Sequence, residues 1–323
     1  MRARLTSFFP PIMALLLVAL AQPAASSGRG AGYFPNISLT THDGEIVRFY
    51  DDLVAEKVVA INFIFTTCPD SCPAETAKLL QVQRELGERV GDDIFMYSIS
   101  IDPDHDTPEV LAEYREKFDI APGWTFLTGK EEDITLLRRK LGLYMEEIQG
   151  DDGDHNLTFI VGNDNTGRWI KRSPFDNPRV LAKLIGYDLF DGQIARKNAK
   201  SYTSAPNAPE FSKGSYLFRT RCESCHTIGG GESRLGPDLM GVSERRSHDW
   251  LVRWIKEPDK MIQEGDPEAV ELFNRYQQIA MPNLRLSDDQ ANALIEFIDQ
   301  ETQMLQGRLA RGATDSPKED AQH

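Results

Sequence analysis

Residues 58–74 read VVAINFIFTTCPDSCPA and set the architecture of the N-terminal half of the chain. Their first eight residues form a continuous apolar run rich in β-branched and aromatic side chains, which predicts a strand buried on both faces. From Ala74 onward apolar residues recur at helical spacing, at Ala77, Leu80 and Leu86. We therefore expect Cys68 at a strand-to-helix turn and Cys72 near the first turn of the helix.

These two cysteines are expected to act together as a redox-active or metal-binding pair. Four positions apart, their sulfurs can lie on the same side of the turn and close on one soft metal ion or on each other. A helix N-terminus favours a thiolate, so the position predicts a lowered cysteine pKa. Soft thiolates select Cu(I), and an imidazole as third ligand also suits Cu(II).

His155 is the candidate for that third ligand. It follows an acidic loop and precedes another buried-strand pattern at residues 157–161. The loop carboxylates of Asp151, Asp152 and Asp154 are expected to be solvated, and the alternative is that they steer a cation or a basic partner toward His155. We expect His42 in a turn and His105 in a solvated polar loop.

The second cysteine pair has a different spacing and predicts a covalent haem. In Cys222-Glu-Ser-Cys225-His226, two thiols three positions apart can add to the vinyl groups of one porphyrin, and the histidine can then reach the iron. The alternative is half of a zinc site. It would need two further ligands, and His248 is the only other local candidate.

The sequence around this motif resembles class I cytochrome c from about Phe211 to Gln303. A predicted helix over residues 211–221 runs into the motif, and Ser287-Asp288-Asp289 predicts the N-cap of a last helix. In that family a methionine just before the last helix is the sixth iron ligand, a position matched here by Met281. Met240 and Met261 are the rival candidates.

The N-terminal half resembles the Sco/SenC family from about Tyr33 to Asp188. The resemblance rests on ordered motifs, namely FTTCPDSCP at 65–73, SISIDP at 98–103, DTPE at 106–109, WTFLTG at 124–129, and His155. It implies a thioredoxin-like α/β fold and a copper ion held by Cys68, Cys72 and His155. It also implies a role in maturing the dinuclear copper centre of cytochrome c oxidase, and a thiol-disulfide reductase role is an alternative.

The chain is thus expected to contain an α/β thioredoxin-like domain followed by an all-α cytochrome c domain. The predicted segments are a signal peptide (1–25), the Sco/SenC domain (33–190), a linker (191–209), the cytochrome c domain (210–304) and a disordered tail (305–323). The apolar core of the first segment, near residues 12–21, is shorter than the about 20 residues that span a bilayer. We expect export to the periplasm, whose oxidising conditions suit both cysteine sites, with an uncleaved membrane anchor as the alternative.

Charge narrows the expected partners. With 36 Lys and Arg against 50 Asp and Glu, the formal net charge is −14, which argues against binding nucleic acid. The resemblances imply the copper-bearing subunit of cytochrome c oxidase, a copper donor protein and other redox proteins as partners. We expect an association with the membrane only if the signal segment is retained.

Electron stoichiometry favours one function over its rivals. A haem and the Cu(II)/Cu(I) couple each move one electron, whereas a dithiol moves two. Met/His ligation raises a haem potential, and structural disulfides lie below about −300 mV, so a haem is not expected to reduce the Cys68–Cys72 disulfide. We expect a copper chaperone with a redox-coupled haem; the alternatives are a thiol-disulfide oxidoreductase with the haem as acceptor, and an electron carrier with a Sco-type sensor.

Overall fold

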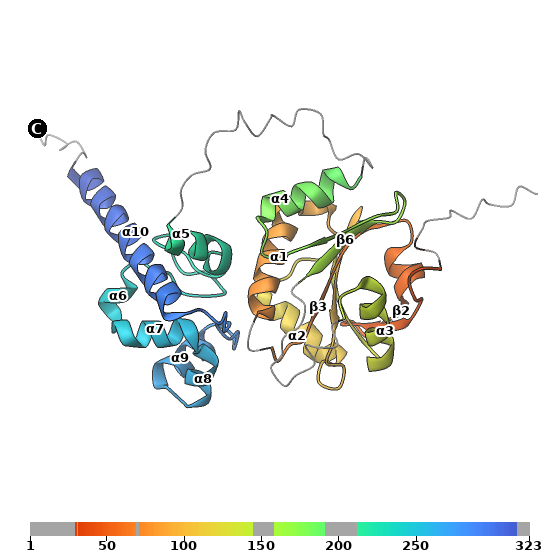
Figure 1. Ribbon diagram of the computed structural model, residues 1–323, viewed down its shortest axis with the longest axis horizontal. Helices are drawn as coiled ribbons and strands as arrows, with labels where there is room; N and C mark the ends of the chain where they lie inside the picture. The colour runs from red at the N-terminus through yellow and green to blue at the C-terminus, as the bar shows by residue number, and fades with distance from the viewer. Residues whose placement is uncertain (1–29, 31, 69–70, 145–157, 191–211, 315–323) are drawn as a thin grey trace, which may run out of the picture.

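The computed structural model describes residues 30, 32–68, 71–144, 158–190 and 212–314, which form a sheet domain and a helical domain (Figure 1). The sheet has seven strands in the order β2-β1-β5-β4-β3-β6-β7. Its strands are β1 (Ser38–Thr41), β2 (Ile46–Arg48), β3 (Val58–Ile64), β4 (Ile94–Ser100), β5 (Trp124–Gly129), β6 (Phe159–Asn163) and β7 (Arg168–Arg172).

Three parallel strands form the centre of this sheet. β4 pairs with β3 and β5 in parallel, and β6 pairs with β3 in antiparallel fashion. The prediction that β3 is buried on both faces is confirmed, because all seven of its residues are buried. Val58, Ala60 and Ile64 join one core cluster, and Val59 and Ile61 join the other, as the period-two geometry of a strand requires.

Helices cover both faces of the sheet. One face packs against α1 (Cys72–Leu86), α2 (Pro108–Phe118), α4 (Pro178–Lys183) and the turn η4 (Leu184–Asp188). The other face packs against α3 (Glu131–Leu141) and the turn η1 (Phe49–Val54). The short turn η2 (Gly87–Arg89) follows α1. This arrangement confirms the thioredoxin-like α/β class expected from the sequence.

The helical domain confirms the second part of the predicted fold. It contains α5 (Lys213–Leu217), the turn η6 (Phe218–Cys222), α6 (Val242–Arg245), α7 (His248–Lys256), α8 (Pro258–Gln263), α9 (Pro267–Arg275) and α10 (Asp288–Thr314). Its hydrophobic cluster is small, consisting of Leu217, Phe218, Leu294, Phe297 and Ile298. A Cβ atom at Gly214 would lie 1.9 Å from the carbonyl oxygen of Ala293, so only glycine permits this approach of α5 to α10.

The boundaries of α10 partly agree with the sequence-based prediction. The Ser287 hydroxyl accepts a hydrogen bond from the backbone N–H of Gln290 at 3.3 Å, which confirms the predicted N-cap. The predicted disordered tail is wrong for residues 305–314, which continue this helix. Leucine, glutamine, arginine and alanine in this stretch favour a helix even without a buried face, and polarity alone was a poor indicator.

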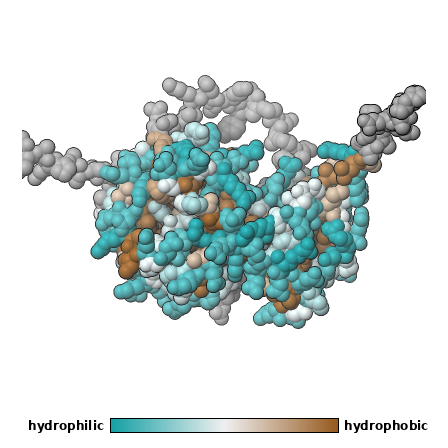
Figure 2. All heavy atoms as spheres, turned by 180° about the vertical axis from the view of Figure 1, so that it is seen from behind, coloured by the Kyte–Doolittle hydropathy of each residue, from teal (hydrophilic) through white to brown (hydrophobic). Residues whose placement is uncertain are grey.

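Other predicted segments lie outside the described residues, among them the signal peptide 1–25 and the linker 191–209. Among the helices that the structure describes, none is both long enough and apolar enough to cross a bilayer. Figure 2 shows hydrophilic residues over most of the face opposite to that of Figure 1, with scattered hydrophobic spots.

The two domains contact each other on the α1 face of the sheet domain. Cys225, Leu235 and Ile279 of the helical domain pack against the hydrophobic cluster that contains α1. The Lys78 ammonium on α1 donates a hydrogen bond to the carbonyl oxygen of Arg219 at 3.1 Å. The segment before the second cysteine pair is therefore held against the helix that begins at Cys72.

Candidate functional site

The first cysteine pair lies where the sequence places it. Cys72 is the first residue of α1, and Cys68 lies on the turn after β3. Both cysteines are buried thiols, with 4% of Cys68 and none of Cys72 exposed. A hydrogen bond joins the two side chains, so the sulfurs lie on the same side of the turn.

The predicted lowering of the cysteine pKa is wrong for Cys72. Burial raises the pKa of this thiol well above its usual value, and the hydrogen bond with Cys68 raises it further. Desolvation penalises the thiolate, and the backbone hydrogen bond with Phe65, which acts in the opposite direction, is outweighed. A protonated thiol in this position is therefore a poor nucleophile.

A buried polar network lies beneath the thiol pair, on the same face of the sheet. The Asn62 amide donates to the Glu75 carboxyl at 3.0 Å and accepts from the Ser98 hydroxyl at 2.7 Å, which in turn accepts from Trp124 at 2.9 Å. Burial raises the pKa of Glu75 to about 8, although the bond from Asn62 opposes this shift. Sequence reasoning missed Glu75, because only the fold places its helix position over Asn62.

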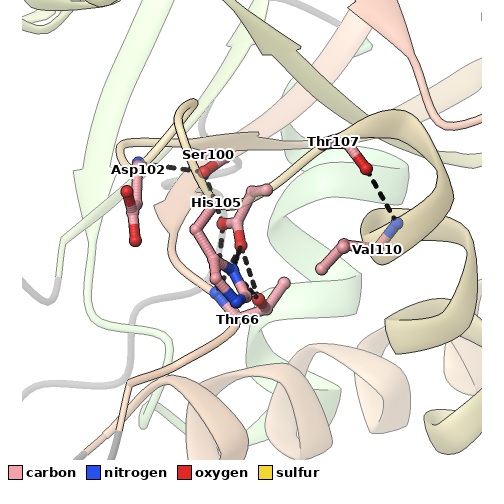
Figure 3. A network of polar contacts seen from close by, with 7 residues as sticks. Thr66, Ser100, Asp102, His105, Thr107 and Val110 are labelled. Atoms are coloured by element: carbon pink, nitrogen blue, oxygen red, sulfur yellow. Dashed lines mark hydrogen bonds and ion pairs between the residues drawn. The ribbon is translucent and has the colours of Figure 1, made fainter.

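A second network fixes the backbone just before Cys68. The Asp106 carboxylate is fully buried and accepts hydrogen bonds from the Thr66 backbone and hydroxyl, from the Ser100 hydroxyl at 2.5 Å, and from His105 Nδ1 at 3.0 Å. Figure 3 shows Thr66, Ser100 and His105 converging from separate segments. Asp106 thus positions the Cys68 turn, while His105 keeps half of its side chain exposed.

His42 lies in the turn between β1 and β2, as predicted, and its side chain is buried. Its Nε2 accepts a hydrogen bond from Arg115 at 2.7 Å. Burial, and then the charge of Arg115, lower the pKa of His42. A neutral imidazole in this place joins the turn to α2.

His155 and the acidic residues Asp151, Asp152 and Asp154 lie outside the described residues. Within the described ranges, no group of three His, Cys, Asp or Glu side chains is arranged to hold a metal ion.

The second cysteine pair lines a cavity in the helical domain. Cys222, Cys225, His226 and Met281 all contribute to its wall, and the rest is mainly apolar, including Leu235, Trp254, Ile279, Ile295 and Ile298. Met240 and Met261 do not line this cavity, and Met261 is buried in α8. Two thiols, one imidazole and one thioether around an apolar space fit a covalently attached haem with His and Met axial ligands.

His226 has the orientation that an iron ligand needs. Its Nδ1 donates to the carbonyl oxygen of Pro237 at 3.0 Å, which leaves Nε2 unprotonated and available to a metal. Burial lowers the pKa of this imidazole, and the bond to Pro237 opposes that effect. A Cβ atom at Gly236 would lie 2.8 Å from the ring, so a glycine is required beside it.

Asp238 stabilises the loop that follows His226. Although burial acts to raise its pKa, hydrogen bonds from the Thr227 hydroxyl and from the backbone N–H groups of Gly229, Met240 and Gly231 bring that pKa to about 2. The carboxylate therefore organises the loop on the His226 side of the cavity.

One residue of the sheet domain also lines this cavity. Pro73, which directly follows Cys72, shares the cavity wall with Cys222, Cys225 and His226. The start of α1 therefore lies next to the predicted haem, and the two cysteine sites are neighbours in the folded chain. Sequence reasoning left open whether the two domains contact each other.

Together, the fold and the two sites define a thioredoxin-like domain with a buried thiol pair, joined to a cytochrome c domain, the class of domain that binds haem c. The SCO1/SenC family model matches residues 29–184, and the Cytochrome c family model matches residues 211–302. A "SCO2-like protein" of Rickettsia felis is 32% identical over 158 residues, which cover 46% of this chain and 74% of that protein. The chain belongs to the SCO1/SenC family.

Two solved structures resemble single parts of the chain. Bradyrhizobium japonicum ScoI with copper bound is 25% identical, with a TM-score of 0.40, over 47% of this chain and 97% of that one. The cytochrome c domain of the pp3183 protein from Pseudomonas putida is 49% identical, with a TM-score of 0.28, over 30% of this chain and 94% of that one.

Proposed function

We propose that this chain is an exported copper-binding protein for assembly of the dinuclear copper centre of cytochrome c oxidase, with a haem c that exchanges single electrons with the copper site. Cys68, Cys72 and His155 would bind the copper cargo. Cys222 and Cys225 would attach the haem, and His226 and Met281 would bind its iron. The observation that carries the proposal is the cavity wall shared by Pro73, Cys222, Cys225 and His226.

The chemistry of the thiol pair supports copper as the cargo. Two buried sulfurs in hydrogen-bond contact can converge on one soft ion, and the Asp106 network holds the turn on which Cys68 lies. Cu(I) binding would replace the thiol protons, and burial then excludes water from the metal. When bound, the haem supplies a one-electron couple, which matches Cu(II)/Cu(I).

The alternative function is a thiol-disulfide oxidoreductase that uses the haem as electron acceptor. The contact between the two thiols is compatible with a disulfide, but the raised pKa of Cys72 makes its thiol a weak nucleophile. We favour copper binding because the haem and the Cu(II)/Cu(I) couple each move one electron, whereas a dithiol moves two. The copper-bearing oxidase subunit, a copper donor protein and other redox proteins are the proposed partners, and the periplasm is the proposed location, with an uncleaved membrane anchor as the alternative.

Copper stoichiometry in the haem-loaded protein tests this function. Wild type and His155→Ala are each titrated with Cu(II) and followed by visible spectroscopy, with His248→Ala as the matched control. We expect one copper per chain, a Cu(II)–thiolate band that is lost in His155→Ala, and control behaviour like wild type. Absence of copper binding together with haem reduction by the dithiol would instead support the oxidoreductase.

A further inference from the structure

Lys78 is a buried cation at the contact between the two domains. Only 3% of this residue is exposed, although lysine is among the residues least often buried. It lies six residues after Cys72 on α1, and its ammonium donates to the carbonyl oxygen of Arg219 at 3.1 Å. A buried ammonium is stable only where other groups compensate its lost hydration, so its surroundings are informative.

Those surroundings belong to the haem-attachment segment. The Lys78 ammonium lies within electrostatic range of residues 221–225, which include the carboxylate of Glu223, the guanidinium of Arg221 and the side chains of Cys222 and Cys225. Burial lowers the pKa of Lys78, and Glu223 opposes that shift. The sheet domain thus places a positive charge beside the two residues that would attach the porphyrin.

Two further contacts hold the domains in this arrangement. The Arg234 guanidinium donates to the carbonyl oxygen of Glu116 at 2.7 Å and to that of Lys117 at 3.2 Å. These carbonyls belong to the last turn of α2, the end of the helix that carries partial negative charge. The guanidinium of Arg221 lies over the Phe175 ring, 4.5 Å from its centroid. Lys78 is therefore fixed beside the haem segment from several sides.

We propose that Lys78 is a positioning residue for the haem of its own chain, which fastens α1 to the haem-attachment segment and raises the reduction potential of the haem. The physical reason is charge: ferric haem carries one more positive charge than ferrous haem, and a nearby buried ammonium disfavours that extra charge. Reduction of ferric to ferrous haem adds one electron and needs no proton.

A linked consequence concerns the docking of the domains. Because Lys78 favours the ferrous form only when the domains are in contact, reduction of the haem must strengthen that contact by the same factor. If the haem exchanges electrons with the copper site, as proposed above, the reduced chain is then the one in which Pro73 and the haem are held together. This consequence rests on the proposed function, whereas the effect of Lys78 on the potential does not.

The test is a spectroelectrochemical titration of the full-length, haem-loaded, copper-free protein. Lys78→Met is compared with wild type, with Lys78→Arg as the charge-retaining variant and with Lys140→Met, at an exposed lysine of α3, as the matched control. We expect Lys78→Met to lower the ferrous-to-ferric ratio about tenfold at fixed ambient potential. This corresponds to a reduction potential that is about 59 mV more negative for a one-electron couple. Lys78→Arg should restore most of the potential, and Lys140→Met should leave it unchanged.

A Lys78→Met protein with an unshifted potential and unchanged axial-ligand bands would overturn the inference. If that variant does not accumulate, Arg234→Lys provides the second test, because it keeps the positive charge at this position but loses the paired hydrogen bonds of the guanidinium to the carbonyl oxygens of Glu116 and Lys117. A negative shift in Arg234→Lys supports the role of Lys78, and an unshifted potential overturns it. Since copper is absent throughout, failure here is distinct from failure to bind copper.

Discussion

The two cysteine sites differ in their surroundings: one is enclosed by protein side chains, and the other borders a cavity. Cys68 and Cys72 are buried by the protein itself, on a turn between a central strand and a helix, above a core that fills both faces of a seven-stranded sheet. Cys222 and Cys225 are only partly buried and line a cavity, beside a hydrophobic cluster of five buried residues. The comparison teaches that the sheet domain supplies its own core, whereas the helical domain needs the haem as part of its core.

The largest effect on the difference between the two domains should come from removal of the haem-attachment cysteines. In a Cys222→Ser/Cys225→Ser variant we expect the helical domain to lose its cooperative unfolding transition, because the apolar cavity would lack its occupant, while the sheet domain keeps its own. Urea unfolding followed by circular dichroism measures both transitions. In the matched variant Cys68→Ser/Cys72→Ser, the transition of the helical domain should persist; its loss there would contradict the account.

The substitution Asp106→Asn should destabilise the sheet domain, which carries Cys68 and Cys72, and leave the helical domain unchanged. The buried carboxylate accepts hydrogen bonds from Thr66, Ser100 and His105, and an amide cannot accept them all. We expect a loss of about 2–3 kcal/mol in the free energy of unfolding of the sheet domain, together with weaker copper binding. The exposed neighbour Asp104→Asn is the control, and equal effects of the two variants would show that the network does not position the turn.

Low pH should destabilise the helical domain through protonation of Asp238. Its pKa is about 2 in the folded protein against an ordinary value of 3.8. Because the pKa of Asp238 is lower in the folded protein than in the unfolded chain, its carboxylate stabilises the folded protein at any pH above 3.8. This stabilisation is lost as the pH falls toward the folded-state pKa. We therefore expect the loop after His226 to loosen between about pH 4 and pH 2, monitored by the Soret band. Asp238→Asn should lose this dependence on pH, and an unchanged acid transition in that variant would assign it to other groups.

The smallest effect should come from the ion pair between Arg179 and Glu85, two residues on the surface of the sheet domain. The Arg179 side chain is 83% exposed, and the two groups lie 3.2 Å apart. Exposed pairs contribute about 0–1 kcal/mol, so Arg179→Ala should change the free energy of unfolding by less than about 0.5 kcal/mol. Chemical denaturation measures this, and a much larger loss would mean that surface charge, rather than the core, stabilises the sheet domain.

The sequence was sufficient wherever chemistry depends on local spacing. The apolar run of β3, the position of Cys72 at a helix start and the N-cap at Ser287 are all local features, and the structure has them as predicted. The placement of Met281 in the wall of the cavity was predictable only through the resemblance to class I cytochrome c.

What the sequence could not reveal depends on contacts between distant segments. Asp106 reaches Thr66 across 40 residues, and Lys78 reaches Arg219 across 141. The pKa of Cys72 was predicted in the wrong direction, because helix position is readable from the sequence and the depth of burial is not. The polar composition of residues 305–314 predicts disorder, whereas their helix propensity agrees with the observed continuation of α10.

The central claim, that the two sites exchange single electrons, is tested most directly by adding Cu(II) to the ferrous, copper-free protein under anaerobic conditions. The visible spectrum should show one haem oxidised for each Cu(II) bound, and His155→Ala should lose this coupling. A wild-type haem that stays ferrous after copper has bound, or one that is oxidised equally fast in His155→Ala, would contradict the claim.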